Sequence, residues 1–122
     1  MHPFRQKLIA TVQASARSSK AYSAKLMEMA EREESFAARV PAGAGVAKVN
    51  IAILMAMAEL QESAGSRYAG IAAQLTAQPE GQSVTSLTES FCDMSREQNE
   101  LMENLMNIFA ATHETPPDPD ES

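Results

Sequence analysis

Residues that could carry out chemistry are few in this chain and lie far apart. Its two histidines, His2 and His113, stand near opposite ends, and neither has a carboxylate three or four residues away to complete a metal site on one helix face. The AGAG stretch at 42–45 lacks the lysine and the preceding strand of a phosphate-binding loop. The sequence therefore predicts no metal, no cofactor and no enzymatic activity.

The single cysteine and the two tyrosines are the remaining candidates. No histidine lies near Cys92 in the sequence to activate its thiol, so we expect a packing cysteine. A lone cysteine also excludes an internal disulfide, which is typical of a cytoplasmic protein. Tyr22 and Tyr68 both fall on apolar rows with helical spacing, and we expect them in the core with their hydroxyl groups at its rim.

The length and charge of the chain restrict its class. A chain of 122 residues with 44% hydrophobic residues, eight Met and no Trp is sufficient for one helical domain. Its net charge of −6 argues against nucleic acid as a partner. The charge is unevenly distributed, because residues 1–25 contain five bases and no acid, whereas residues 79–122 contain ten acids and one base.

Two stretches rich in proline and glycine divide the chain. They are VPAGAG at 40–45 and QPEGQS at 78–83, and both are typical of turns between helices. We expect helices at about 4–39, 45–77 and 84–112, forming an all-α, elongated, antiparallel three-helix coiled-coil domain over residues 1–112. The acidic, proline-rich tail at 113–122 is predicted to be disordered. The longest apolar run, 51–58, is far shorter than the roughly 20 residues of a membrane span.

Apolar residues recur at helical spacing in all three predicted helices. In the first, the row runs Leu8, Val12, Ser15, Ser19, Tyr22, Leu26, Met29, Glu33, Phe36 and Val40. The second repeats every eleven residues, which predicts a nearly straight contact face. The third follows steps of three and four, with Gln98 as its polar member. For the second and third helices, the predicted seam for packing or dimerisation is Met57, Leu60, Tyr68, Ile71, Phe91, Met94, Leu101, Leu105 and Ile108.

Two further expectations concern how the helices meet. Small residues beside the second helix's seam, including Gly65, Gly70 and Ala72, predict close approach by neighbouring helices. The apolar rows exceed what one rod-like monomer can cover, so we expect a homodimer. A polar residue in an apolar seam selects one register, and the sequence alone predicts that Gln98→Leu raises the melting temperature and loosens oligomer specificity.

The N-terminal segment combines an apolar stripe with basic residues, which suits an anionic membrane surface. Its candidate membrane-binding residues are Arg5, Lys7, Arg17, Lys20 and Lys25. A basic, serine-rich, amphipathic segment is also typical of a mitochondrial targeting peptide. A third interpretation is that these residues are simply the first turns of the first helix. The sequence leaves these three alternatives open.

Two segments resemble BAR domains of the sorting-nexin type. Residues 58–109, beginning AELQESAGSRYAG, resemble the last two helices of that family, and SARSSKAYSAKLMEMAEREESFA at 15–37 resembles the first. The resemblance implies an antiparallel homodimer that lies on anionic membranes through Lys and Arg. BAR domains are usually much longer, and the acidic third helix departs from a membrane-binding face.

Two functional hypotheses follow from these patterns. The first is a non-enzymatic, dimeric helical scaffold in the cytoplasm that associates peripherally with anionic membranes. The second is a soluble helical adaptor or chaperone that binds an amphipathic helix of a partner protein.

Overall fold

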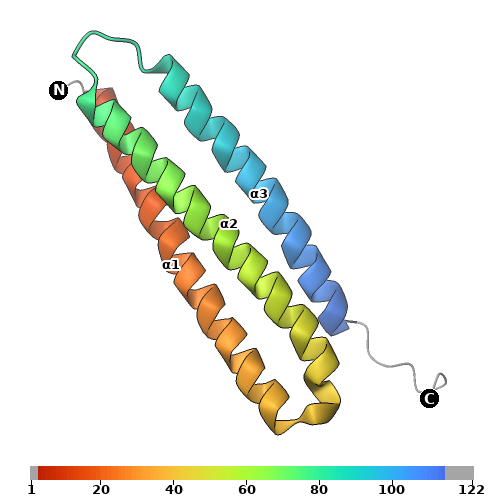
Figure 1. Cartoon of the computed structure of the whole chain (residues 1–122). Coiled ribbons are helices and arrows are strands. Elements are labelled where there is room, and N and C mark those ends of the chain that lie inside the picture. The colour runs from red at the N-terminus through yellow and green to blue at the C-terminus, as the bar shows by residue number, and fades with distance from the viewer. Residues whose placement is uncertain (1–2, 115–122) are drawn as a thin grey trace.

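The computed structural model describes residues 3–114 of the chain as three long helices (Figure 1). Helix α1 spans Pro3–Arg39, α2 spans Ala44–Ala77 and α3 spans Thr85–Glu114, with a short 3-10 turn, η1, at Pro41–Gly43. The expected helices are confirmed to within two residues at every end. Most of the predicted disordered tail, residues 115–122, lies outside the described residues.

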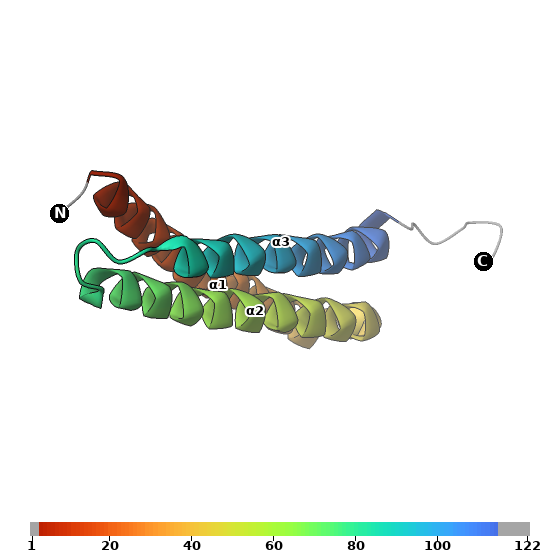
Figure 2. The same ribbon diagram turned by 90° about the horizontal axis from the view of Figure 1, so that it is seen from above.

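The three helices form an antiparallel, all-α bundle in which α2 packs against both neighbours. Figure 2 shows α1 passing obliquely behind the other two helices. Proline and glycine make the two connections: Pro41 opens η1, and Gly81, with φ of +88°, supplies the left-handed residue of the second turn. Short connections of this kind keep successive helices antiparallel.

The core consists of two apolar clusters, one toward each end of the bundle. In the cluster nearer the N-terminus, the rings of Tyr68 and Phe91 meet edge to face with centroids 5.2 Å apart. Its buried members are Ile9, Val12, Ala16, Ala64, Tyr68, Ile71, Ala72 and Leu75. The buried members of the second cluster are Leu26, Ala30, Ile53, Leu54, Met57, Ala58 and Met102.

A polar layer separates the two apolar clusters. Gln98 Nε2 donates a buried hydrogen bond of 2.7 Å to Gln61 Oε1, which joins α3 to α2. Ser23 Oγ donates a 2.8 Å hydrogen bond to the carbonyl of Ala58 and joins α1 to α2. Gln98 therefore meets a polar partner at one register, as its place in the seam predicts, and this partner belongs to the same chain.

The face that α1 turns toward the core differs from the expected row. Val12, Ser19 and Leu26 are buried as expected. The other buried positions along this row are Ala16, Ser23 and Ala30, each one residue beyond the expected Ser15, Tyr22 and Met29. The expectation that Tyr22 belongs to the core is wrong, because its side chain is 42% exposed.

Close contact between α1 and α2 explains why the buried face of α1 is rotated from the expected one. A Cβ atom added to Gly65 would lie 2.6 Å from Lys20 Cγ and 3.1 Å from the carbonyl oxygen of Ala16. Only small side chains fit where two helix backbones come this near, so alanine and serine face α2 while the larger Tyr22 and Met29 turn outward. The expected close approach is confirmed at Gly65 and is absent at Gly70, which has open space around it.

The inner face of α3 also shifts along its second half. Beyond Gln98 the buried or half-buried positions are Met102, Leu105 and Phe109, whereas Leu101 and Ile108 are 42% and 51% exposed. These positions continue an eleven-residue repeat that matches the repeat of α2, and two nearly straight faces stay in contact over their whole length. Of the other predicted seam residues, Met57, Tyr68 and Ile71 are buried, and Leu60, Phe91, Met94 and Leu105 pack at the edges of the clusters.

The hydrogen bond between the two glutamines changes the expected effect of Gln98→Leu. The substitution leaves the buried Gln61 amide without its partner, so we expect the free energy of unfolding to fall by about 1–3 kcal/mol. Replacing both glutamines by leucine removes both polar groups and should restore most of that loss. Urea unfolding of the wild type and the two variants measures both effects. A higher melting temperature for Gln98→Leu alone would contradict this account.

Candidate functional surfaces

Arg5 has a structural role that differs from the expected contact with a membrane. Its side chain is only 5% exposed, and it donates hydrogen bonds to three backbone carbonyls at the C-terminal end of α2. Arg5 Nε and Nη1 lie 3.1 Å from the carbonyl oxygens of Leu75 and Pro79, and Nη2 donates to those of Leu75 and Gln78. Arg5 is therefore a C-terminal cap for α2 and is not available to a membrane surface.

The end of a helix explains why a buried arginine is stable there. The last carbonyls of a helix have no partner within it and carry the negative end of the helix dipole. The guanidinium group supplies several hydrogen-bond donors for these carbonyls and a positive charge that is favourable beside the negative end of the dipole. The sequence contains a signal that Arg5 faces the core. Arg5 precedes the buried Val12 by seven residues, so the two side chains lie on the same face of α1.

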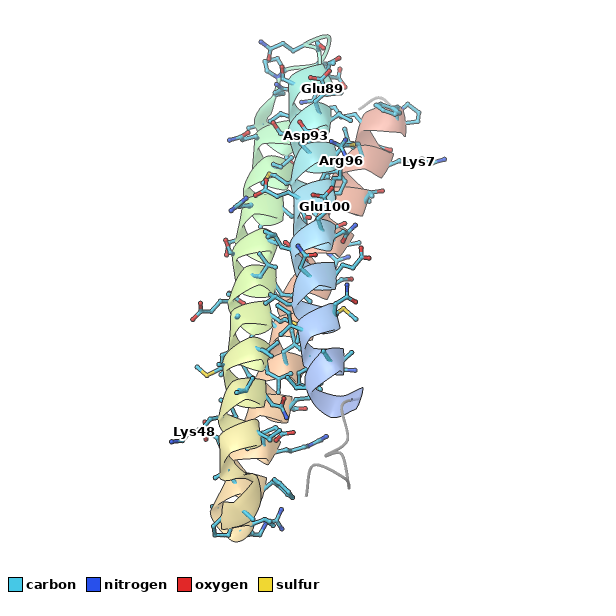
Figure 3. The ribbon with its side chains drawn as sticks, turned by 90° about the vertical axis from the view of Figure 1, so that its right-hand side faces the viewer. Lys7, Lys48, Glu89, Asp93, Arg96 and Glu100 are labelled. Carbon is cyan, nitrogen blue, oxygen red and sulfur yellow. The ribbon has the colours of Figure 1, made fainter. Side chains whose placement is uncertain are left out.

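Three of the five expected membrane-binding residues remain exposed and unpaired among the described residues. Lys20 is not one of them, since its Nζ lies 3.0 Å from Glu62 Oε1 and 3.4 Å from Ser66 Oγ, both on α2. The others, Lys7, Arg17 and Lys25, form what we call the basic face of α1. Figure 3 shows Lys7 pointing away from the bundle. No acidic residue precedes Glu28 in α1, so this face is uniformly positive.

Acidic side chains cover the outer side of α3. Figure 3 shows Glu89, Asp93, Arg96 and Glu100 along one side of this helix. Arg96 Nη1 lies 3.5 Å from Asp93 Oδ1, but both side chains are largely exposed, so this pair adds little stability. An anionic membrane would repel this surface, which disfavours contact through α3.

A polar hollow lies between α1 and α3. It is lined by Ser15, Ser18, Ser19, Gln61, Tyr68, Ser95, Gln98 and Asn99. Residues seven apart share a helix face, so Tyr22 and Met29 of α1 continue the line of Ser15, and Met106 of α3 continues that of Asn99. All three side chains are between 39% and 50% exposed. We call the strip of surface formed by Tyr22, Met29 and Met106 the α1–α3 groove.

Opposite charges line the two sides of the α1–α3 groove. On α1, Lys25 and Arg32 each follow an apolar residue of the groove by three positions. On α3, Glu103 precedes Met106 by three positions. All three charged side chains are exposed. The groove is therefore flanked by Lys25 and Arg32 on α1 and by Glu103 on α3.

Helix α2 is the most apolar of the three. Together with η1 it forms the segment Pro41–Ala77, which is long and apolar enough to span a membrane by length and composition, a test that the central helix of a soluble bundle also passes. Here α2 packs against α1 and α3, yet only 33% of its most apolar window is buried within the chain. Its outward side therefore retains apolar surface.

The described residues contain no group of three or more His, Cys, Asp or Glu side chains that could hold a metal ion. Cys92 is exposed, so it does not pack within this chain as expected of a packing cysteine. Its position on α3, one residue after the half-buried Phe91, accounts for this exposure, because the next residue of a helix lies about 100° around its axis. The surfaces described above are the candidates for function.

Comparison with known proteins adds no relative. No protein-family model matches the chain, and no curated protein or solved structure matches it either. The resemblance to BAR domains consequently rests on the sequence pattern alone.

We expect Arg5→Gln to lower the free energy of unfolding by about 2–3 kcal/mol, because several charge-assisted hydrogen bonds to α2 are lost. Arg5→Lys keeps the charge but not the fork of donors, so its free energy of unfolding should lie between those of the wild type and Arg5→Gln. Lys7→Gln is the matched control, since Lys7 is exposed two residues away, and should change stability by less than about 0.5 kcal/mol. Urea unfolding at low and high salt measures all three. Equal effects of Arg5→Gln and Lys7→Gln would refute the capping role.

Proposed function

We propose that this protein is a non-enzymatic helical adaptor that binds an amphipathic helix of a partner protein in the α1–α3 groove. The observation that carries the proposal is the exposed apolar row on α1, where Tyr22, Met29 and Phe36 recur every seven residues and are 39–44% exposed. This spacing is that of a coiled-coil seam, and a seam without a facing helix fits the apolar stripe of one.

The opposite walls of the groove define the chemistry of the partner. A helix seated on Tyr22, Met29 and Met106 would place one edge beside Lys25 and Arg32 and the other beside Glu103. We therefore propose a partner helix with acidic residues along one edge, basic residues along the other and an apolar stripe between them. The charges fix the direction in which the helix lies, because reversing it would bring like charges together.

The size of the groove predicts modest affinity. Completing the burial of one half-exposed apolar side chain contributes roughly 1 kcal/mol. Burial of four such side chains contributes about 4 kcal/mol, from which the cost of association must be subtracted. These side chains are Tyr22, Met29, Phe36 and Met106. Micromolar binding requires about 8 kcal/mol, so the partner's own apolar residues and the charged edges must contribute a similar amount.

A synthetic amphipathic helix tests this proposal. The probe is a labelled peptide of about 20 residues with leucine along its seam, glutamate on one edge and lysine on the other. We expect Met29→Glu to weaken its binding at least about tenfold, since the charge would be buried without a partner. Fluorescence anisotropy measures the dissociation constant.

Met55→Glu is the matched control for Met29→Glu. Met55 is also 39% exposed, but it lies on α2 rather than on α1. It should leave peptide binding unchanged. Equal binding by the wild type and Met29→Glu would exclude the groove as the site.

The basic face of α1 supports a second candidate function, peripheral association with anionic membranes in the cytoplasm. The specific observation is that Lys7, Arg17 and Lys25 are exposed on a stretch without acids. Each basic residue gains about 1 kcal/mol near an anionic surface, so three give only about 3 kcal/mol. Association should therefore be weak and sensitive to salt, and a dimer would strengthen it by doubling the contacts.

Co-sedimentation with vesicles containing phosphatidylserine tests the membrane candidate. We expect the wild type to bind at low salt and to dissociate as the salt concentration rises. The triple variant Lys7→Glu, Arg17→Glu, Lys25→Glu should not bind and should keep its helicity, because none of these side chains is buried. Arg67→Glu, at an exposed position on α2, is the control. Absence of wild-type binding at low salt would eliminate this candidate.

A further inference from the structure

The outward side of α2 carries an apolar patch with one charge at each end. Lys48 and Glu59 are separated by eleven residues, or three helical turns, and therefore lie on the same face. Ala52, Met55 and Ala56 lie between them on that face. All five residues are exposed. We call this set the α2 outer face.

Neither charge of the α2 outer face has a partner in the part of the chain that the structure describes. The described ion pairs and side-chain hydrogen bonds involve neither Lys48 nor Glu59. The two residues cannot pair with each other, because eleven residues span about 16 Å of helix. Figure 3 shows Lys48 pointing away from α1 and α3.

We propose that the α2 outer face binds the same face of a second copy of this chain, with the two α2 helices antiparallel about a two-fold axis. The arrangement follows from the spacing of the charges. When an antiparallel pair is centred between Ala52 and Met55, Lys48 of each copy faces Glu59 of the other. The face is thus self-complementary, which is the requirement for a symmetric dimer interface.

Small residues at the centre permit close contact between the two copies. Ala52 and Ala56 allow the helix axes to come near the lower end of the usual 8–10 Å range, while Met55 fills the remaining space. Dimerisation would bury the apolar surface of α2 that α1 and α3 leave exposed. A membrane or an unrelated partner would not require the matched pair of charges.

Apolar side chains on both neighbouring helices lie at the level of this centre. Ser23 of α1 contacts Ala58, so Met27, one turn further along α1, lies near Leu54. Thr112 Oγ1 of α3 lies 2.9 Å from Asn50 Oδ1, so Ile108, one turn earlier, also lies near that level. Met27 is 39% exposed and Ile108 51% exposed. These residues widen the patch across all three helices, toward the area that a stable dimer needs.

The interface leaves the proposed functions of the other surfaces intact. It uses the outer side of α2, whereas the α1–α3 groove and the basic face of α1 lie on other sides of the bundle. The two-fold axis would give each dimer two grooves and two basic faces.

Charge reversal tests the interface without disturbing the fold, since both residues are exposed. Lys48→Glu or Glu59→Lys alone turns two attractive contacts into repulsive ones. Because the two-fold axis doubles each change, we expect either variant to raise the dissociation constant about tenfold or more. Sedimentation velocity across the micromolar range measures this constant, and circular dichroism verifies that each variant is folded.

Recombining the reversed charges gives the decisive comparison. The double variant Lys48→Glu, Glu59→Lys should dimerise like the wild type. An equimolar mixture of the two single variants should form a heterodimer, because each carries the charges that the other lacks. Lys7→Glu and Glu100→Lys are controls with the same changes in charge on other surfaces, and Met29→Glu, which tests the α1–α3 groove, should also leave dimerisation unchanged.

Three results would overturn the proposal. They are a wild type that stays monomeric throughout the micromolar range, single variants that associate as the wild type does, and a mixture that fails to recover association. Each of these outcomes is independent of peptide binding in the groove, so the adaptor function could survive the loss of the dimer.

Discussion

The buried hydrogen bond between Gln98 and Gln61 is the constraint on which the arrangement of α3 depends. Apolar contacts are non-directional, so two clusters of Ala, Leu, Ile and Met alone would tolerate sliding of α3 along α2. A displacement by one turn would leave two buried amides without partners. The polar layer therefore fixes the register of the helices, and with it the positions of every surface residue on α3 relative to α1 and α2.

The close approach of α1 and α2 at Gly65 determines which side chains are left for interactions. Alanine and serine occupy the inner face of α1 because nothing larger fits there. As a result Tyr22, Met29 and Phe36, which a monomer with wider spacing would bury, lie on the surface. The same packing that stabilises the pair of helices thus produces the apolar row of the α1–α3 groove, and stability and the proposed binding function share one cause.

The charges of the chain have separate tasks that their totals conceal. Arg5 holds α1 against α2 through the carbonyls at the end of that helix, and Lys20 is paired with Glu62 of α2 at the surface. Lys7, Arg17 and Lys25 remain on the surface, as do the acids of α3. The basic N-terminal segment is therefore partly structural, which lowers the membrane attraction that five free cations would provide and favours the adaptor interpretation over the membrane one.

The helical class, the two turns and the length of each helix could be predicted from the sequence, because proline, glycine and helical periodicity act over a few residues. The sequence also indicated the eleven-residue repeat of α2 and the need of Gln98 for a polar partner. It did not determine which of two adjacent rows of α1 faces α2, since both rows have the spacing of a seam and differ by a small rotation of the helix. It did not identify the role of Arg5 either, because the carbonyls that this side chain caps belong to residues 70 to 74 positions away. Only the tertiary structure decides such questions, because the contacts that settle them join segments brought together by the fold itself.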